Sequence, residues 1–458
     1  MTAENHPMAI FLERVASRAA AMVLAATLIA GATAHAQVFN PETVTLPNGL
    51  QVVAITNARA PVVAHMVWYR IGAADEPPGK SGIAHFLEHL MFKGTKEIPP
   101  GEFSKIIANN GGRDNAFTSY DYTGYFQNIA RDRLELVMKM EADRMSNLVL
   151  TDAEVNPERE VIREERRSVV DNNPRSRLRE QLNAALFLNH PYGRPIIGWD
   201  HEIRDLTTAD ALAWYRNYYA PNNAILVVAG DITMADLKPL AEKYYGAIPS
   251  KPMPARVRPV EPPHQVARRV ELKDSRVRQV TWNRVYLAPS YVAGEKEHAD
   301  PLQVLAEVVG GGVSSRLHRA LVLDRPLTTG AGAYYDPDSL DQTGFGVSAA
   351  LRPETRIEDF EAAMEAELRR IVEEGVTDDE VERAKSRMRA AAVYARDSLQ
   401  GGARALGTAI VTGTSIDHVE NWPQRMATVT AAQVAAAARV VLREERSVTG
   451  VLLPKPGS

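Results

Sequence analysis

Residues 81–95 read SGIAHFLEHLMFKGT, and this stretch organises the predicted fold around one short helix. Its apolar side chains recur at helical spacing and form a single stripe for burial, made of Ile83, Phe86, Leu87, Leu90 and Met91. His85 and His89 are four residues apart, so their rings lie on one helix face and can reach the same metal ion. Glu88 stands about one turn from His85, which places a carboxylate beside that metal position.

A metal site of this kind needs a third protein ligand, and the chain contains no cysteine to supply one. A predicted helix after Thr151 carries five glutamates: Glu154, Glu158, Glu160, Glu164 and Glu165. Glu158 and Glu165 are seven residues apart and therefore share a face. Charged helices of this type usually face solvent, so the spacing alone leaves each of these carboxylates open as a ligand. His65 lies in a predicted strand and is expected to pack in the core.

The composition is that of an ordinary globular protein, with 45% hydrophobic residues in a chain of 458. This length predicts about two to four domains. The net charge of −4 provides no basic field, so nucleic acid is not an expected partner. The absence of cysteine also excludes disulfides, thiol catalysis and thiolate metal sites.

The N-terminal segment predicts export from the cell interior. Arg14 and Arg18 precede an apolar run over residues 19–32, and Ala34-His35-Ala36 fits a cleavage site of the A-x-A type. We therefore predict a signal peptide over residues 1–36 and, for a bacterial chain, a periplasmic protein. The apolar run is short for a membrane span, so an uncleaved anchor and a mitochondrial presequence are the alternatives.

Strands and helices alternate along the predicted first half. The predicted strands are two short runs around the turn Pro47-Asn48-Gly49, residues 62–69, a strand or strand pair in 115–126, and 224–228. The predicted helices are 83–93, 99–110, 132–148, 152–170 and 208–219. Residues 249–265 are dense in proline, which disfavours regular structure and indicates a linker. We predict an N-terminal domain at 37–250, a linker at 251–267 and a C-terminal domain at 268–458.

The second half repeats the first at lower fidelity. The segment NLVLTDAEVNPEREVIREERR (147–167) resembles EEGVTDDEVERAKSRMRAA (373–391), and both halves end in a helix followed by a strand. An α+β unit used twice is therefore expected: two similar tandem domains, each a mainly antiparallel sheet covered by helices. Only the first copy carries the H-x-x-E-H pattern, so the second is expected to lack a metal site.

Several motifs in order resemble the pitrilysin family of zinc metallopeptidases, which carry the inverzincin H-x-x-E-H motif. The closest likeness is to the mitochondrial-processing-peptidase-like branch, and it covers nearly all of the chain after the predicted signal peptide. The segments that carry it are His85–His89, Glu158–Glu165, Asn115–Tyr125, the loop PYGRPIIG at 191–198, and YYAPNNAILVVAGD at 218–231.

The resemblance implies a role for each matching residue. His85, His89 and Glu165 would be the ligands of one Zn²⁺ ion, with Glu164 as the rival of Glu165. Glu88 would be the general base that takes a proton from water, and Glu158 the accessory carboxylate of the catalytic set. The segment that pairs with the backbone of the substrate would contain Asn115, Ala116 and Phe117.

One feature departs from the family pattern. Self-sufficient members carry an Arg and a Tyr seven residues apart, shortly after a Ser-Arg-Leu segment, which here stands at 315–317. Val322 and Thr329 occupy the two positions, and neither offers the missing donors. We therefore expect a heterodimer in which a homologous partner supplies the pair. The alternatives are substitution by a nearby side chain, namely Arg319, Arg325 or Tyr334, and a shifted alignment of the second copy with the family pattern.

The sequence thus predicts a zinc-dependent endopeptidase that hydrolyses extended or unfolded peptides. Substrate would add as a strand to a sheet edge, where backbone pairing supplies affinity. The alternative from another class is a non-catalytic peptide-binding or assembly subunit related to the family.

Overall fold

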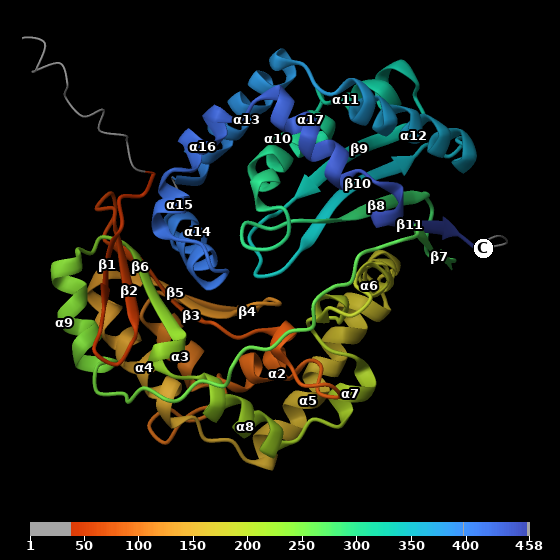
Figure 1. The fold of residues 1–458 in the computed structure, drawn as a ribbon. Coiled ribbons are helices and arrows are strands. Elements are labelled where there is room, and N and C mark those ends of the chain that lie inside the picture. The colour runs from red at the N-terminus through yellow and green to blue at the C-terminus, as the bar shows by residue number, and fades with distance from the viewer. Residues whose placement is uncertain (1–37, 397, 456–458) are drawn as a thin grey trace, which may run out of the picture. The chain divides into compact units, whose positions relative to one another are not determined.

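The structure is a computed structural model that describes residues 38–396 and 398–455 (Figure 1). The predicted signal peptide at 1–36 lies outside the described residues. Within the described part of the chain, every helix is too short or too polar to cross a lipid bilayer.

The first sheet has six strands in the order β1-β2-β6-β3-β5-β4. Their bounds are β1 (Glu42–Thr45), β2 (Gln51–Thr56), β3 (Val62–Tyr69), β4 (Arg113–Thr118), β5 (Thr123–Ala130) and β6 (Ala224–Gly230). All pairs are antiparallel except β2 with β6. The central strands β3 and β6 consist mainly of apolar residues and are buried almost throughout, whereas β4 forms an edge of the sheet. This edge position leaves one side of the β4 backbone without a strand partner.

Helices of the first half cover one face of this sheet and form its main core. They are α2 (Ile83–Leu90), α3 (Glu102–Asn109), α4 (Leu134–Asn147), α5 (Asp152–Arg166), α7 (Asp200–Arg204), α8 (Thr208–Tyr218) and α9 (Met234–Tyr244). The core also accounts for His65, which is fully buried and bonds through its two ring nitrogens to Gln127 and Tyr245. The expectation that His65 is a packed residue is confirmed.

The second sheet has the strand order β7-β11-β8-β10-β9. Its strands are β7 (Arg268–Asp274), β8 (Thr281–Ala288), β9 (Thr328–Tyr335), β10 (Thr343–Leu351) and β11 (Ser447–Pro454). This order repeats β2-β6-β3-β5-β4, and the parallel pair β7 with β11 stands where β2 pairs with β6. The predicted α+β fold with two similar units is confirmed.

The second half also supplies its own covering helices. They are α10 (Ala299–Gly310), α11 (Arg316–His318), α12 (Ile357–Glu374), α13 (Asp378–Arg396), α16 (Trp422–Thr428) and α17 (Ala431–Val441). The short helix α15 (Ile416–Glu420) packs Ile416 and Val419 against a cluster on the first sheet instead. Residues from α10, α12, α13, α16 and α17 form a second core with β8, β10 and β11.

Two helices are exchanged between the halves. Helix α6 (Pro174–Leu186) packs Leu182 and Leu186 against strands of the second sheet, and α14 (Leu399–Val411) packs on the free face of the first sheet (Figure 1). Gly407 of α14 lies against the ring of Trp68, where an added Cβ would stand 2.2 Å from a ring atom. Each sheet therefore takes its strands from one side of the linker, whereas α6 and α14 each pack on the sheet of the other half. The predicted domain limits stay a prediction.

The linker is also fixed by a buried ionic cluster. Arg258 donates to Asp75 at 2.9 Å, to Asp121 at 2.5 Å and to Asp341 at 2.9 Å. The Tyr192 hydroxyl donates a further bond of 2.6 Å to Asp121. Because Asp341 belongs to the second half, this one arginine ties both halves to the linker.

Candidate metal centre

Helices α2 and α5 bring the predicted metal ligands together. The Nε2 atom of His85 lies 3.7 Å from a carboxylate oxygen of Glu165, and the Nε2 atom of His89 lies 3.4 Å from the same oxygen. One ligand atom from each residue lies within 4.8 Å of the others, and no second such group of three exists among the described residues. Their role as ligands stays a prediction.

The arrangement fits a zinc ion. Two ligands held at about 2.0–2.2 Å by one tetrahedral zinc lie about 3.4 Å apart, close to the separations found here. The inward oxygen of Glu165 is buried, and apart from its 3.4 Å contact with His89 it has no hydrogen-bond partner among the residues that the structure describes. A buried polar atom normally has a close partner, so a cation bound between the three side chains would fit this oxygen.

Glu164 does not compete for this position. Its side chain is 66% exposed and pairs with Arg167 at 3.1 Å on the outer surface of α5. Consecutive residues of a helix point about 100° apart, so Glu164 and Glu165 cannot both face α2. The geometry therefore favours Glu165.

A second carboxylate orients one of the rings. Glu158 accepts a 2.8 Å hydrogen bond from Nδ1 of His89 and also pairs with Lys93. This bond leaves Nε2 as the atom that faces Glu165. Burial disfavours the charge on Glu158, but the bonds with His89 and Lys93 outweigh it and lower its pKa.

The rings differ in protonation. Burial, assisted by the neighbouring His89, lowers the pKa of His85 to about 4, so this ring is neutral at pH 7, as metal binding requires. Burial also opposes a charge on His89, but Glu158 and Glu165 outweigh it and raise its pKa to about 9. The contact with His89 lowers the pKa of Glu165, which is therefore a carboxylate. A metal would have to displace one proton from His89.

Glu88 lies on the same helix, beside the ligands. It is buried and accepts a 2.6 Å hydrogen bond from the hydroxyl of Thr118, the last residue of β4. Burial raises the pKa of Glu88 to about 7. The bond joins the candidate base to the edge strand that was predicted to hold substrate.

The start of α2 is anchored by two glutamates from outside the helix. The buried carboxylate of Glu76 accepts bonds of 3.0 Å from the backbone N–H groups of Gly82 and Ala84. Glu202 accepts a bond of 2.6 Å from the N–H of Ser81. These bonds satisfy donors that an α-helix leaves free at its N-terminus, and so fix the position of the helix.

A glycine contact connects this start to α5. Gly82 has φ +90°, and an added Cβ would lie 2.7 Å from the carbonyl oxygen of Ile197. The next carbonyl, of Gly198, accepts a 2.8 Å bond from Arg166, the neighbour of Glu165. The loop at 197–199 thus lies between the helices that carry the candidate ligands and sets their separation.

The predicted substrate segment lies on the edge strand β4. Asn115 is exposed, and its side chain accepts a 2.9 Å bond from the N–H of Ala116. The ring of Phe117 packs instead against Trp68, with centroids 4.9 Å apart, in the cluster covered by α14. Contact of these three residues with substrate stays a prediction.

The second half contributes no obvious equivalent of the missing Arg and Tyr. Val322 lies in the helical turn Arg319–Asp324, and the Thr329 hydroxyl donates to the carbonyl of Ala350 at 3.2 Å. Arg319 and Arg325 are exposed, and Tyr334 lies on β9.

Sequence reasoning missed four supporting residues: Glu76, Lys93, Thr118 and Glu202. Lys93 stands four residues after His89, so helical spacing could have indicated it. The other three act through loops or a strand end, where spacing carries no signal.

Comparison with known proteins identifies the family of the chain. Residues 51–200 match the model of insulinase (peptidase family M16), and residues 205–388 match that of the peptidase M16 inactive domain. The zinc protease PqqE of Helicobacter pylori is 34% identical over 375 residues, covering 80% of this chain and 83% of that protein. An uncharacterised zinc protease of Streptomyces coelicolor is 29% identical over 451 residues, covering 97% of this chain and 96% of its own.

A solved structure shows the same relationship. The crystal structure of a protease from Helicobacter pylori has a TM-score of 0.84 and 29% identity, and the match covers 91% of this chain and 100% of that one. The chain belongs to peptidase family M16, the pitrilysin-type metallopeptidases.

Proposed function

We propose that this chain is a zinc-dependent endopeptidase that hydrolyses extended or unfolded peptides. The observation that carries the proposal is the convergence of His85, His89 and Glu165, with Glu88 buried on the same helix. The predicted signal peptide supports action in the periplasm, and the relatives named zinc proteases support the metal.

The residues would divide the work as follows. Zinc, held by the two imidazoles and the Glu165 carboxylate, supplies a Lewis acid that acidifies water and polarises the scissile carbonyl. Glu88 takes the proton of the attacking water and passes it to the departing amine, a contribution of about 10²–10⁴-fold. Glu158 holds the ring of His89 in its binding orientation, and Thr118 holds Glu88.

Substrate would bind along β4. The unpaired side of this edge strand offers backbone donors and acceptors to an extended peptide. Pairing of this kind supplies affinity with little dependence on side chains, which suits unfolded substrates.

We further propose that the chain is the catalytic subunit of a heterodimer. Val322 and Thr329 offer no Arg and Tyr to close over the substrate carbonyl, and a homologous partner would supply them. The purified chain alone should then hydrolyse peptides far more slowly than the chain co-purified with its partner. Equal rates would contradict the heterodimer without touching the zinc site.

A non-catalytic peptide-binding subunit is the second candidate, favoured by the match of residues 205–388 to the inactive domain. Glu88→Gln separates the two functions. The variant should retain about one zinc per chain by mass spectrometry while hydrolysis of a quenched fluorescent peptide falls by about 10²-fold or more. Glu164→Gln, a similar change on the outer surface of α5, is the control and should keep full activity. Normal hydrolysis by Glu88→Gln would contradict the proposed base.

A further inference from the structure

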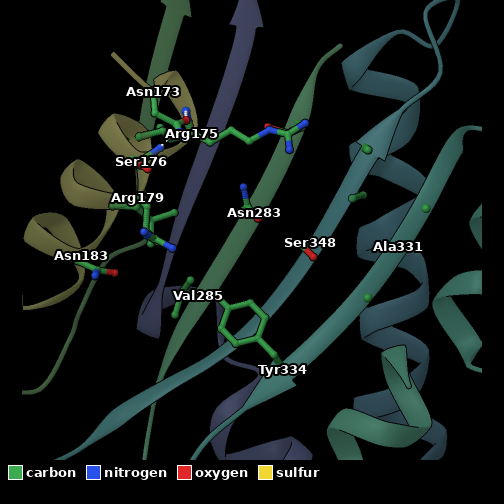
Figure 2. Close-up of a pocket in the computed structure, with 17 residues that line it drawn as sticks. Asn173, Arg175, Ser176, Arg179, Asn183, Asn283, Val285, Ala331, Tyr334 and Ser348 are labelled. Atoms are coloured by element: carbon green, nitrogen blue, oxygen red, sulfur yellow. Dashed lines mark hydrogen bonds between the residues drawn. The ribbon is translucent and has the colours of Figure 1, made fainter. Parts of the chain in front are cut away.

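A large cavity lies between α6 and the inner face of the second sheet, outside the candidate metal centre. Its volume is about 820 Å³, and its walls come from α6, β8, β9 and β10 (Figure 2). Gly330 and Gly332 of β9 line the cavity and have no side chains to fill it, while Tyr334 of the same strand lies over Gly346 of β10. Helix α6 covers part of this sheet face, as α14 covers the equivalent face of the first sheet, and the cavity lies beside α6 over β8, β9 and β10.

The cavity carries positive charge without a counter-charge. Arg175 and Arg179, four residues apart on α6, line it together with neutral residues, and none of the lining residues is acidic. Neither guanidinium has an ion pair or side-chain hydrogen bond with the described residues. By contrast Arg177, on another face of α6, pairs with Asp274 at 3.3 Å.

Neutral hydrogen-bonding groups face the same space. Asn283 of β8 and Ser348 of β10 line the cavity opposite α6, and neither side chain has a hydrogen-bond partner in the described part of the chain. Figure 2 shows Arg175 extending from α6 across the strands, on the side where Asn283 projects. Guanidinium forks beside neutral donors are a common means of recognising a carboxylate.

A second, smaller cavity lies beside the first, next to the turn that follows β4. Its volume is about 290 Å³, residues 119–122 of the turn line it, and it shares Asn183 and Tyr334 with the first. Three aspartates, Asp121, Asp336 and Asp338, also line this second cavity, so the unbalanced positive charge is confined to the first. This turn directly follows Thr118, whose hydroxyl bonds to Glu88. A peptide that lies along β4 can therefore continue past the turn toward the two arginines.

We infer that Arg175 and Arg179 bind a carboxylate of the peptide substrate, either its C-terminal group or an acidic side chain. The chain would then select peptides with an anionic group at a distance from the scissile bond. This selection rests on the proposed peptidase function, and a binding measurement on a variant that cannot hydrolyse peptide keeps the two apart.

The probe is a fluorescein-labelled unstructured peptide with several Asp and Glu residues and a free C-terminus. Fluorescence anisotropy would measure its affinity for the zinc-loaded full chain carrying Glu88→Gln. Adding Arg175→Gln and Arg179→Gln together should weaken binding at least about tenfold, because each lost bond involves two charged groups. Binding of a control peptide with an amidated C-terminus and Asn and Gln in place of the acids should not change.

The matched control is Arg177→Gln, the same change of charge on the same helix outside the cavity, which should leave both affinities unchanged. If amidation of the C-terminus alone removes the effect of the two arginine substitutions on peptide affinity, the arginines bind the C-terminal carboxylate. If replacement of Asp and Glu by Asn and Gln removes that effect, they bind acidic side chains. The inference is overturned if the chain binds acidic and neutral peptides equally, or if Arg177→Gln weakens binding as much as the double variant. Hydrolysis of neutral peptide by the chain with Glu88 intact tests the peptidase function separately.

Discussion

The two halves of the molecule share a framework and differ in chemistry. Helices α5 and α13 begin alike, because Thr151 and Thr377 each donate a backbone N–H to a glutamate three residues later, at 2.9 and 2.8 Å. A buried valine follows each cap. Where α5 carries Glu158 and Glu165, however, the aligned positions of α13 carry Ala384 and Ala391. Helix α10, which follows β8 as α2 follows β3, contains no histidine.

This difference separates the residues that specify the fold from those that specify the site. Caps, buried valines and strand order recur in both halves, so they suffice to build the unit. The histidines and the two glutamates occur only in the first half, and the second half folds without them. The candidate site is therefore an addition to a framework that does not depend on it.

The largest effect should come from removing the carboxylate that closes the site. Glu165→Gln should leave the chain folded, lower zinc affinity more than about 100-fold and abolish hydrolysis. This loss is larger than the loss expected for a residue that only holds a metal ligand in place. Zinc per chain after dialysis against a buffered zinc solution measures this, with Glu164→Gln as the control. If Glu164→Gln lost zinc and Glu165→Gln kept it, the assignment within α5 would be wrong.

The next largest effect should come from removing Arg258, which connects the two halves to the linker. Arg258→Gln leaves the buried carboxylate of Asp121 without its cation and leaves Asp75 with Arg256 alone, at a cost of about 3–5 kcal/mol. Urea or thermal unfolding of the full chain measures the loss. Arg256→Gln is the comparison in the linker, because its side chain is 31% exposed and its partner Asp75 keeps Arg258. Arg256 also donates to the carbonyl oxygens of Arg70 and Asp121, so we expect a measurable loss that is smaller than that of Arg258→Gln. Equal losses would show that Arg258 has no special role.

Glu158→Gln should have a smaller effect on the same metal. The amide keeps a bond to His89 but loses the charge that pairs with Lys93. Outer partners of this kind typically contribute about 10–100-fold to metal affinity, so zinc titration should show a loss in that range. A loss as large as that of Glu165→Gln would indicate that Glu158 itself binds the metal.

The smallest effect concerns the anchor of α2. Glu76→Gln should cost about 1 kcal/mol at pH 5, because the hydroxyl oxygen of the protonated acid can still accept from one of the N–H groups of Gly82 and Ala84, whereas the amide nitrogen of Gln only donates. Burial raises the pKa of Glu76 from its usual 4.5 to about 8, although Arg194 opposes the shift and Glu202 adds to it. The folded chain therefore holds this proton more tightly than the unfolded chain.

The contribution of protonated Glu76 to the free energy of unfolding is fully present below about pH 4.5 and is lost as the pH rises toward 8. The advantage of the parent chain over Glu76→Gln should consequently shrink across that window. Melting temperatures of both proteins from pH 5 to pH 8 measure it. An advantage that grows with pH would contradict the assigned direction.

Local patterns in the sequence predicted the strands of the first sheet and α2, because alternation and helical spacing are properties of neighbouring residues. Strand β3 has the predicted bounds, Val62–Tyr69. Helices α6, α9 and α14 were not predicted. The glycines of α14 disfavour a helix, and Gly407 is explained only by the distant ring of Trp68. Helix α6 carries Leu178, Leu182 and Leu186 at regular spacing, but these residues pack on the second sheet, whose strands are distant in sequence.

The candidate site could likewise be predicted only in part from the sequence. The spacing of His85 and His89 indicated a shared metal, whereas the choice of Glu165 came only from the family resemblance. The exposure of Glu164 and its pairing with Arg167 supply the geometric reason for that choice. The bond of Thr118 to Glu88 joins a strand end to a helix thirty residues away in sequence, and no local pattern encodes such a contact.

The most direct test of the central claim is a crystal structure of the zinc-loaded chain with anomalous diffraction measured on both sides of the zinc edge. We expect one strong anomalous peak at about 2.0–2.2 Å from Nε2 of His85, Nε2 of His89 and a carboxylate oxygen of Glu165. A well-ordered crystal with no peak between α2 and α5, or with its zinc held elsewhere, would contradict it.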